Sequence, residues 1–163
     1  MTSKADFTDE EWARLKRAPI VAGMGISLAD PGGPIEALKE TAAVLKTVLA
    51  GAEGGGRGEL VDALTADISE DARAHHNPAA GFKPKAGTAG VEILDELRAV
   101  NGIVTAKASP EDAAAFRELL LTAAQNAANA AKEGGFMGWH AVRVSEGEQK
   151  MLDSLRDALG HDD

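Results

Sequence analysis

The stretch SPEDAAAFRELLLTAAQNAANAAKEGG, residues 109–135, decides the fold class of this chain. It opens with a serine that suits a helix N-cap and a proline that suits the first helical position. Large apolar side chains, and then alanines, recur at spacings of three and four, which predicts one long helix with a single buried face. A Gly-Gly pair ends the helix, and its buried face comprises Phe116, Leu119, Leu120, Ala123, Ala127 and Ala130.

The segments around this helix carry the same signature. Aliphatic stripes at helical spacing predict helices over residues 59–74, from a cap at Thr88 to Lys107, and from a capping box of Ser145 and Glu148 to Gly160. Their predicted inward residues are Leu60, Leu64 and Ile68 in the first, Ile93, Leu97, Val100 and Val104 in the second, and Met151, Leu152, Leu155 and Leu159 in the third. A stripe over residues 35–50 predicts another helix, whose inward positions are Ile35, Leu38, Ala42, Leu45 and Leu49.

The N-terminal third predicts two shorter helices. Thr8 and Glu11 form a capping box, and Phe7 and Trp12 occupy the positions of a hydrophobic staple. Because proline lacks the N–H that continues a helix, the first helix is expected to end before Pro19, where a second, buried helix begins and runs to Ala29. Small residues in that second helix predict close approach of a neighbouring helix.

No segment alternates between apolar and polar residues as a half-buried strand does. The sequence therefore predicts an all-α, single-domain bundle of six or seven helices spanning residues 1–163. Five glycines in eight residues predict a flexible linker over 51–58, and the prolines and glycines of 75–88 predict a loop.

Composition excludes several classes of function. The net charge is −9 and the basic residues are scattered, so we expect no nucleic-acid partner. The chain has no cysteine, which excludes disulfides, thiolate catalysis and Cys-ligated metal. No apolar run is long enough to cross a bilayer and no leader-like segment opens the chain, so we expect a cytoplasmic protein with no membrane partner.

Candidate catalytic groups are few. Asp71 and His75 are four residues apart on one helix face and His76 adjoins them, but further zinc ligands are not identifiable. His140 has no evident partner for acid–base work, and no serine lies in a nucleophile elbow. We therefore expect a non-enzymatic protein, although a small-molecule enzyme that uses one of these histidines stays open as an alternative.

An apolar segment follows the longest helix. Phe136, Met137 and Trp139 lie within a few residues of one another in a chain that has only six aromatic residues. Either they form an exposed docking patch or they fold under and plug one end of the bundle. We favour the plug, because an exposed patch of this kind lowers solubility.

Two helix junctions look alike. The first joins Ala29-Asp30 to Ile35, Glu36 and Glu40, and the second joins Glu133 to Val144 and Glu148. This pattern resembles the tellurite-resistance TerB-like family of cytoplasmic helical bundles, which carries two pseudo-repeated Ala-Asp-Gly-x-aliphatic motifs, each followed by a glutamate four residues after the aliphatic position. Here a proline interrupts the first Asp-Gly, Glu40 is displaced by one position, and the second motif begins with a glutamate separated by eleven residues from Val144.

The resemblance implies binding of a divalent cation such as Ca²⁺ by the junction acids and a role in a stress response, through the cation or through a protein partner. Carboxylate oxygens suit such a hard cation. The candidate ligands are Asp30, Glu36, Glu40, Glu133 and Glu148. Carboxylates near a helix N-terminus are also stabilised without any metal. The alternative is therefore a metal-free helical scaffold that self-associates as a homo-oligomer.

Overall fold

The computed structural model describes residues 2–29, 34–54, 56–132 and 144–160. In this part of the chain a short 3-10 helix, η1 (Lys4–Asp6), precedes six α-helices, and there is no β-strand. The prediction of an all-α, single-domain bundle is confirmed. The α-helices are α1 (Asp9–Ala29), α2 (Pro34–Gly54), α3 (Glu59–Arg73), α4 (Ala89–Lys107), α5 (Pro110–Lys132) and α6 (Glu146–Ala158).

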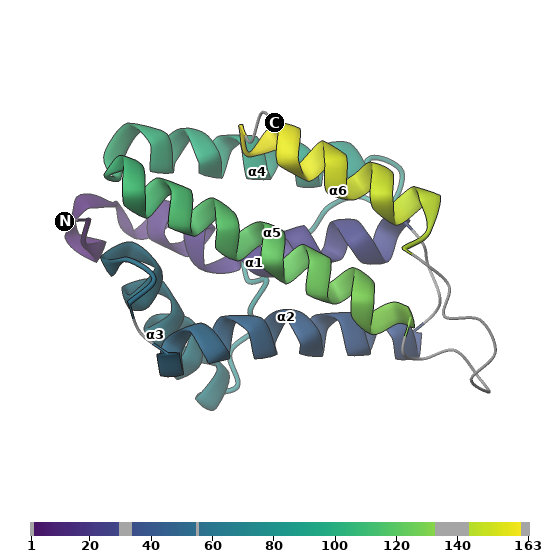
Figure 1. The fold of residues 1–163 in the computed structure, drawn as a ribbon, viewed down its shortest axis with the longest axis horizontal. Coiled ribbons are helices and arrows are strands. Elements are labelled where there is room, and N and C mark those ends of the chain that lie inside the picture. Colours follow the sequence, from purple (N-terminus) through teal and green to yellow (C-terminus); the bar gives the residue numbers. More distant parts are fainter. Residues whose placement is uncertain (1, 30–33, 55, 133–143, 161–163) are drawn as a thin grey trace.

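Helices α1 and α5 form the centre of the bundle, because each packs against all five of the other α-helices. Figure 1 shows α4 and α6 along one side of this central pair and α2 and α3 along the other. The Ala-rich second half of α5 is fully buried at Ala123, Ala124, Ala127 and Ala128. Small side chains at these positions let neighbouring helices approach closely, which explains how a chain with few aromatic residues builds a dry core.

The buried faces of α3, α4, α5 and α6 agree with the predicted stripes. The residues predicted to face inward there are buried, except that Ala130 and Met151 are half-buried. In α2 the buried apolar residues are Val44 and Val48, whereas Ala42 is exposed and Leu45 and Leu49 are half-buried. The predicted register is wrong over the described part of α2, where Val44 rather than Ala42 packs on α1, and the side chains of Ile35 and Leu38 lie outside the described residues.

Pro19 does not separate two helices. It lies inside α1, which continues without interruption for 21 residues. A proline in a helix interior removes one hydrogen bond and costs about 3 kcal/mol. Ala18, Pro19 and Ile20 are all buried, so tertiary packing on both sides of the proline offsets that cost and keeps one helix where two were predicted.

The predicted start of α1 is confirmed. The Thr8 N–H donates to Glu11 Oε2 (2.8 Å) and the Glu11 N–H donates to Thr8 Oγ1 (3.2 Å), which is the capping box of α1. The rings of Phe7 and Trp12 lie 5.7 Å apart, and both are buried.

Residues 75–88 form no helix, as predicted, but α2 continues to Gly54, four residues into the predicted linker of residues 51–58. Isolated glycines cost a helix only about 1 kcal/mol each, so they need not end it.

Candidate functional site

The helix ends that flank the two acidic junctions lie at one end of the bundle. Helix α1 ends and α2 begins there, and so do the end of α5 and the start of α6 (Figure 1). The opposite end holds the N-terminus and η1. Segments more than one hundred residues apart in the sequence are thus brought together, which a shared site requires.

Glu40 links α2 to the last turn of α1. Its side chain is 2% exposed, and its carboxylate accepts a hydrogen bond from the hydroxyl of Ser27. Ser27 lies two residues before the end of α1. A buried carboxylate of the first junction is therefore held against the carbonyl end of this helix.

Glu148 belongs to the first turn of α6 and is 3% exposed. It completes the predicted capping box: the Ser145 N–H donates to its Oε2 (2.8 Å), and its own N–H donates to Ser145 Oγ (3.2 Å). The same turn abuts α1, because a Cβ atom added at Gly147 would lie 2.6 Å from the Ala29 carbonyl oxygen. The second junction thus touches the residue at which α1 ends.

The structure does not describe the side chains of the other three candidate ligands. Asp30 and Glu133 lie outside the described residues, and Glu36 lies in α2 with its side chain outside them. Phe136, Met137, Trp139 and His140 also lie outside them, so the structure leaves the plug hypothesis as a prediction. Among the residues that are described, no group of three His, Asp or Glu side chains is arranged to hold a metal ion.

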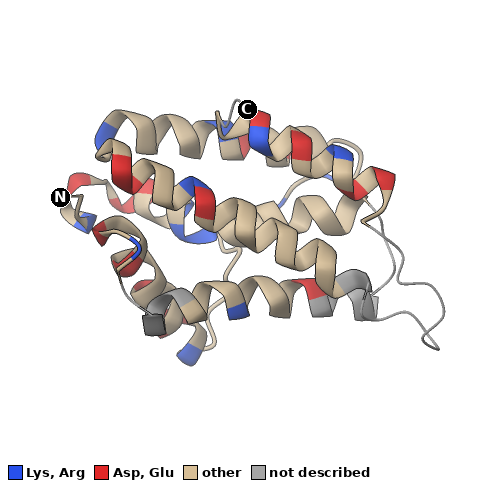
Figure 2. Cartoon of the chain, in the orientation of Figure 1, with Lys and Arg blue, Asp and Glu red and all other residues tan. Residues whose placement is uncertain are grey.

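Helix dipoles do not by themselves decide the charge of the junction end. Two helix C-termini, which carry partial negative charge, and two N-termini, which carry partial positive charge, meet there. These partial charges largely cancel, so the side chains set the sign. Figure 2 shows acidic positions at the start of α6 and on the first half of α2, which makes the described part of this end acidic.

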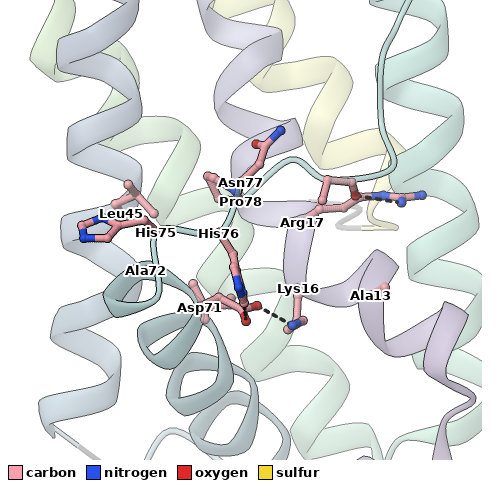
Figure 3. A pocket seen from close by; sticks show the side chains of 12 residues that line it. Ala13, Lys16, Arg17, Leu45, Asp71, Ala72, His75, His76, Asn77 and Pro78 are labelled. Atoms are coloured by element: carbon pink, nitrogen blue, oxygen red, sulfur yellow. Dashed lines mark hydrogen bonds and ion pairs between the residues drawn. The ribbon is translucent and has the colours of Figure 1, made fainter.

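A second candidate site lies between α1, α2, α3 and the segment that follows α3. It is a cavity of about 510 Å³, lined on its polar side by Lys16, Asp71, His75 and His76 (Figure 3). Asp71 forms an ion pair with Lys16, and its Oδ1 lies 3.3 Å from His76 Nδ1. Asp71 therefore pairs with His76 rather than with His75, which was the neighbour expected from helical spacing.

The electrostatics of this cavity follow from those contacts. The hydrogen bond from Lys16 lowers the pKa of Asp71 below its ordinary value; burial opposes this effect, and the contact with His76 adds to it. Asp71 is thus an ionised acceptor shared by one lysine and one histidine at neutral pH.

Sequence reasoning missed the basic residues that serve this cavity. Arg17 also lines it and is anchored from behind by Glu96, whose Oε1 accepts from Arg17 Nη2 at 2.7 Å. Arg14 Nη2 donates to the other oxygen of Glu96 at 2.6 Å. The available signal was a glutamate within an aliphatic stripe, between Ile93 and Leu97, because a carboxylate at a buried position requires cationic partners.

In comparisons with known proteins, no family model, no curated protein and no solved structure matches this chain. Within the described residues, none of the helices combines the length and the apolar character that a bilayer span requires.

Proposed function

We propose that this chain is a non-enzymatic, cytoplasmic helical bundle of the TerB-like kind that binds a divalent cation at its junction end and acts in a stress response through that cation or a protein partner. One observation carries the proposal: the helix ends that flank both acidic junctions lie at the same end of the bundle, where Glu40 is buried against Ser27 of α1 and Glu148 is buried in the turn of α6 that abuts Ala29. Glutamate side chains are rarely fully buried, so two buried carboxylates on helices far apart in sequence are unusual in a small core.

The chemistry of these residues fits a hard cation. Carboxylate oxygens of Glu40 and Glu148 are of the ligand type that Ca²⁺ and Mg²⁺ prefer, and backbone carbonyls at a helix C-terminus lack partners within the helix. Asp30, Glu36 and Glu133 are the further candidate ligands of the same junctions. A bound cation would neutralise the carboxylates that it contacts and hold the ends of α1, α2, α5 and α6 together.

Thermal unfolding with Ca²⁺, Mg²⁺ or a chelator tests the proposal. A cation that binds only the folded state adds about 2.7 kcal/mol at a concentration about a hundredfold above its Kd. For a domain of this size, that is a rise of roughly 5–10 °C in Tm. We expect the rise to be lost in Glu40→Gln and in Glu148→Gln.

Glu146→Gln is the matched control, because Glu146 lies in the same first turn of α6 but is exposed. It removes the same charge from the helix N-terminus without touching the buried pair, so its cation response should equal that of the wild type. If millimolar cation leaves the Tm of the wild type unchanged, or if Glu146→Gln abolishes the rise as completely as Glu148→Gln, the cation proposal is wrong.

A second candidate function, metal-free self-association, is favoured by a different observation. Leu28 on α1 and Val91 on α4 are the large apolar residues that the described surface exposes, at 44% and 63%. They lie on neighbouring helices, since a Cβ atom added at Gly90 would be 3.6 Å from Leu28 Cδ2. Light scattering should then show a mass that rises with concentration, and Val91→Glu should return it to the monomer mass.

A further inference from the structure

The cavity beside α3 has the dimensions of a small-molecule site. Its volume of about 510 Å³ falls in the range of about 300–1,000 Å³ that ligand pockets occupy. Leu45 and Ile68 provide apolar lining, and Lys16 and Arg17 provide charged groups. Apolar walls with a few convergent polar groups are the usual composition of such sites.

The backbone at the rim of this cavity adopts a costly conformation. Helix α3 ends in a Schellman motif: the His76 N–H donates to Asp71 O at 2.9 Å, and the His75 N–H donates to Ala72 O at 3.2 Å. The residue that directly follows the C-cap in this motif takes a left-handed conformation, and glycine normally occupies this position. Here His75 occupies it, with φ +57°. A side chain at such a position destabilises the fold, so a histidine there indicates a use for the side chain.

The motif directs the two histidines differently. In Figure 3 the His76 ring points toward Asp71, whereas the His75 ring points away from it, on the same side as Leu45. His75 is exposed and lines the cavity. The left-handed residue therefore puts an imidazole at the cavity rim without engaging it in the Asp71 ion pair.

The charged residues that line the cavity are more basic than the chain as a whole. The chain carries −9, but the cavity lining has Lys16 and Arg17 as cations and Asp71 as its carboxylate, while Glu96 pairs with Arg17 from outside the lining. The Lys16 ammonium has three N–H groups, and its ion pair with Asp71 uses one of them. Donors and positive charge thus remain for an anion next to an apolar wall.

From these features we infer that the cavity binds a small organic carboxylate with an apolar body. Its carboxylate accepts hydrogen bonds from Lys16 and from the imidazole of His75. Its body packs on Leu45 and Ile68. Arg17 positions the α1 side of the cavity through its bonds to Glu96 and adds to the positive potential.

Isothermal titration of the full chain with octanoate tests this inference, with octylamine as a ligand of equal chain length and opposite charge. We expect saturable binding of octanoate in the sub-millimolar to millimolar range and no binding of octylamine. Lys16→Gln, which keeps two of the four methylenes and a polar end but removes the charge, should weaken octanoate binding by roughly tenfold, as expected for loss of one charge-assisted hydrogen bond. Lys150→Gln is the matched control, since Lys150 is exposed on α6 and does not line the cavity.

His75→Gly separates a functional role from a structural one. Glycine relieves the left-handed strain, so the variant should melt about 2–4 °C higher than the wild type while binding octanoate several-fold more weakly. A His75→Gly protein that is more stable and binds octanoate as the wild type does would overturn the inference. So would equal binding of octylamine, an equal loss of affinity in Lys150→Gln, or no saturable binding of octanoate at millimolar concentration.

Discussion

The contact between Gly23 of α1 and Val44 of α2 offers a direct test of how the bundle is held together. A Cβ atom added at Gly23 would lie 2.7 Å from Val44 Cγ2, far inside the roughly 3.5–4.0 Å at which carbon atoms pack. Val44 is fully buried and β-branched, so its side chain has little freedom to rotate away. Gly23→Ala therefore has to push the two helices apart.

Two opposing terms set the size of the effect. Alanine in place of glycine in a helix interior stabilises by about 1 kcal/mol, and overpacking a well-filled core costs about 1–3 kcal/mol. The expected net destabilisation is about 0–2 kcal/mol. Gly102→Ala is the control, because Gly102 lies inside α4, is exposed, and has no neighbouring atom within 4 Å of an added Cβ. It should stabilise by about 1 kcal/mol, the propensity term alone.

Urea unfolding of the two single variants and of Gly23→Ala in a Val44→Ala background measures these terms. In the Val44→Ala background the clash is absent, so Gly23→Ala should become stabilising by about 1 kcal/mol, like Gly102→Ala. The difference between backgrounds is the coupling energy of the contact. If Gly23→Ala stabilises the otherwise wild-type protein as much as Gly102→Ala does, the argument that close backbone approach positions α2 on α1 is refuted.

Two further predictions concern α1 and its partner on α4. Burial raises the pKa of Glu96, but the hydrogen bonds from Arg14 and Arg17 outweigh it and hold that pKa below its ordinary value. The folded-state pKa is therefore below the unfolded one, so the stabilisation is present above about pH 4.3 and is lost as the pH falls through the folded-state value. Glu96→Gln should lower the free energy of unfolding by about 2–3 kcal/mol at pH 7, somewhat less than the loss of a fully buried pair because both arginines are partly exposed. Urea unfolding at about pH 3 should show a smaller difference between the variant and the wild type. An equal difference at both pH values would contradict the conclusion that Glu96 is ionised and paired in the folded state. Pro19→Ala restores the missing helical N–H at the loss of some buried ring surface, and calorimetry should show a net gain of about 1–2 kcal/mol; a loss of stability would mean that ring packing dominates.

Contacts in the candidate sites differ in whether neighbouring residues in the sequence are enough to predict them. The capping box of Ser145 and Glu148 depends on residues three apart, and the sequence predicted it. That Glu40 reaches Ser27 depends on how α2 lies against α1, which no local pattern specifies. The pairing of Asp71 with His76 likewise depends on the left-handed backbone conformation of His75, which the presence of a histidine does not predict.

The sequence by itself determined which segments are helical and which faces of α3, α4, α5 and α6 are buried, because helical periodicity and end-capping are local properties. Tertiary structure decided the rest. Packing on both sides of Pro19 keeps α1 whole, the fit of Val44 against Gly23 sets the register of α2, and the chain path brings the helix ends that flank the two acidic junctions to one end of the bundle. The physical reason is that these outcomes depend on free energies shared between residues distant in sequence, which exceed the local preferences of any single helix.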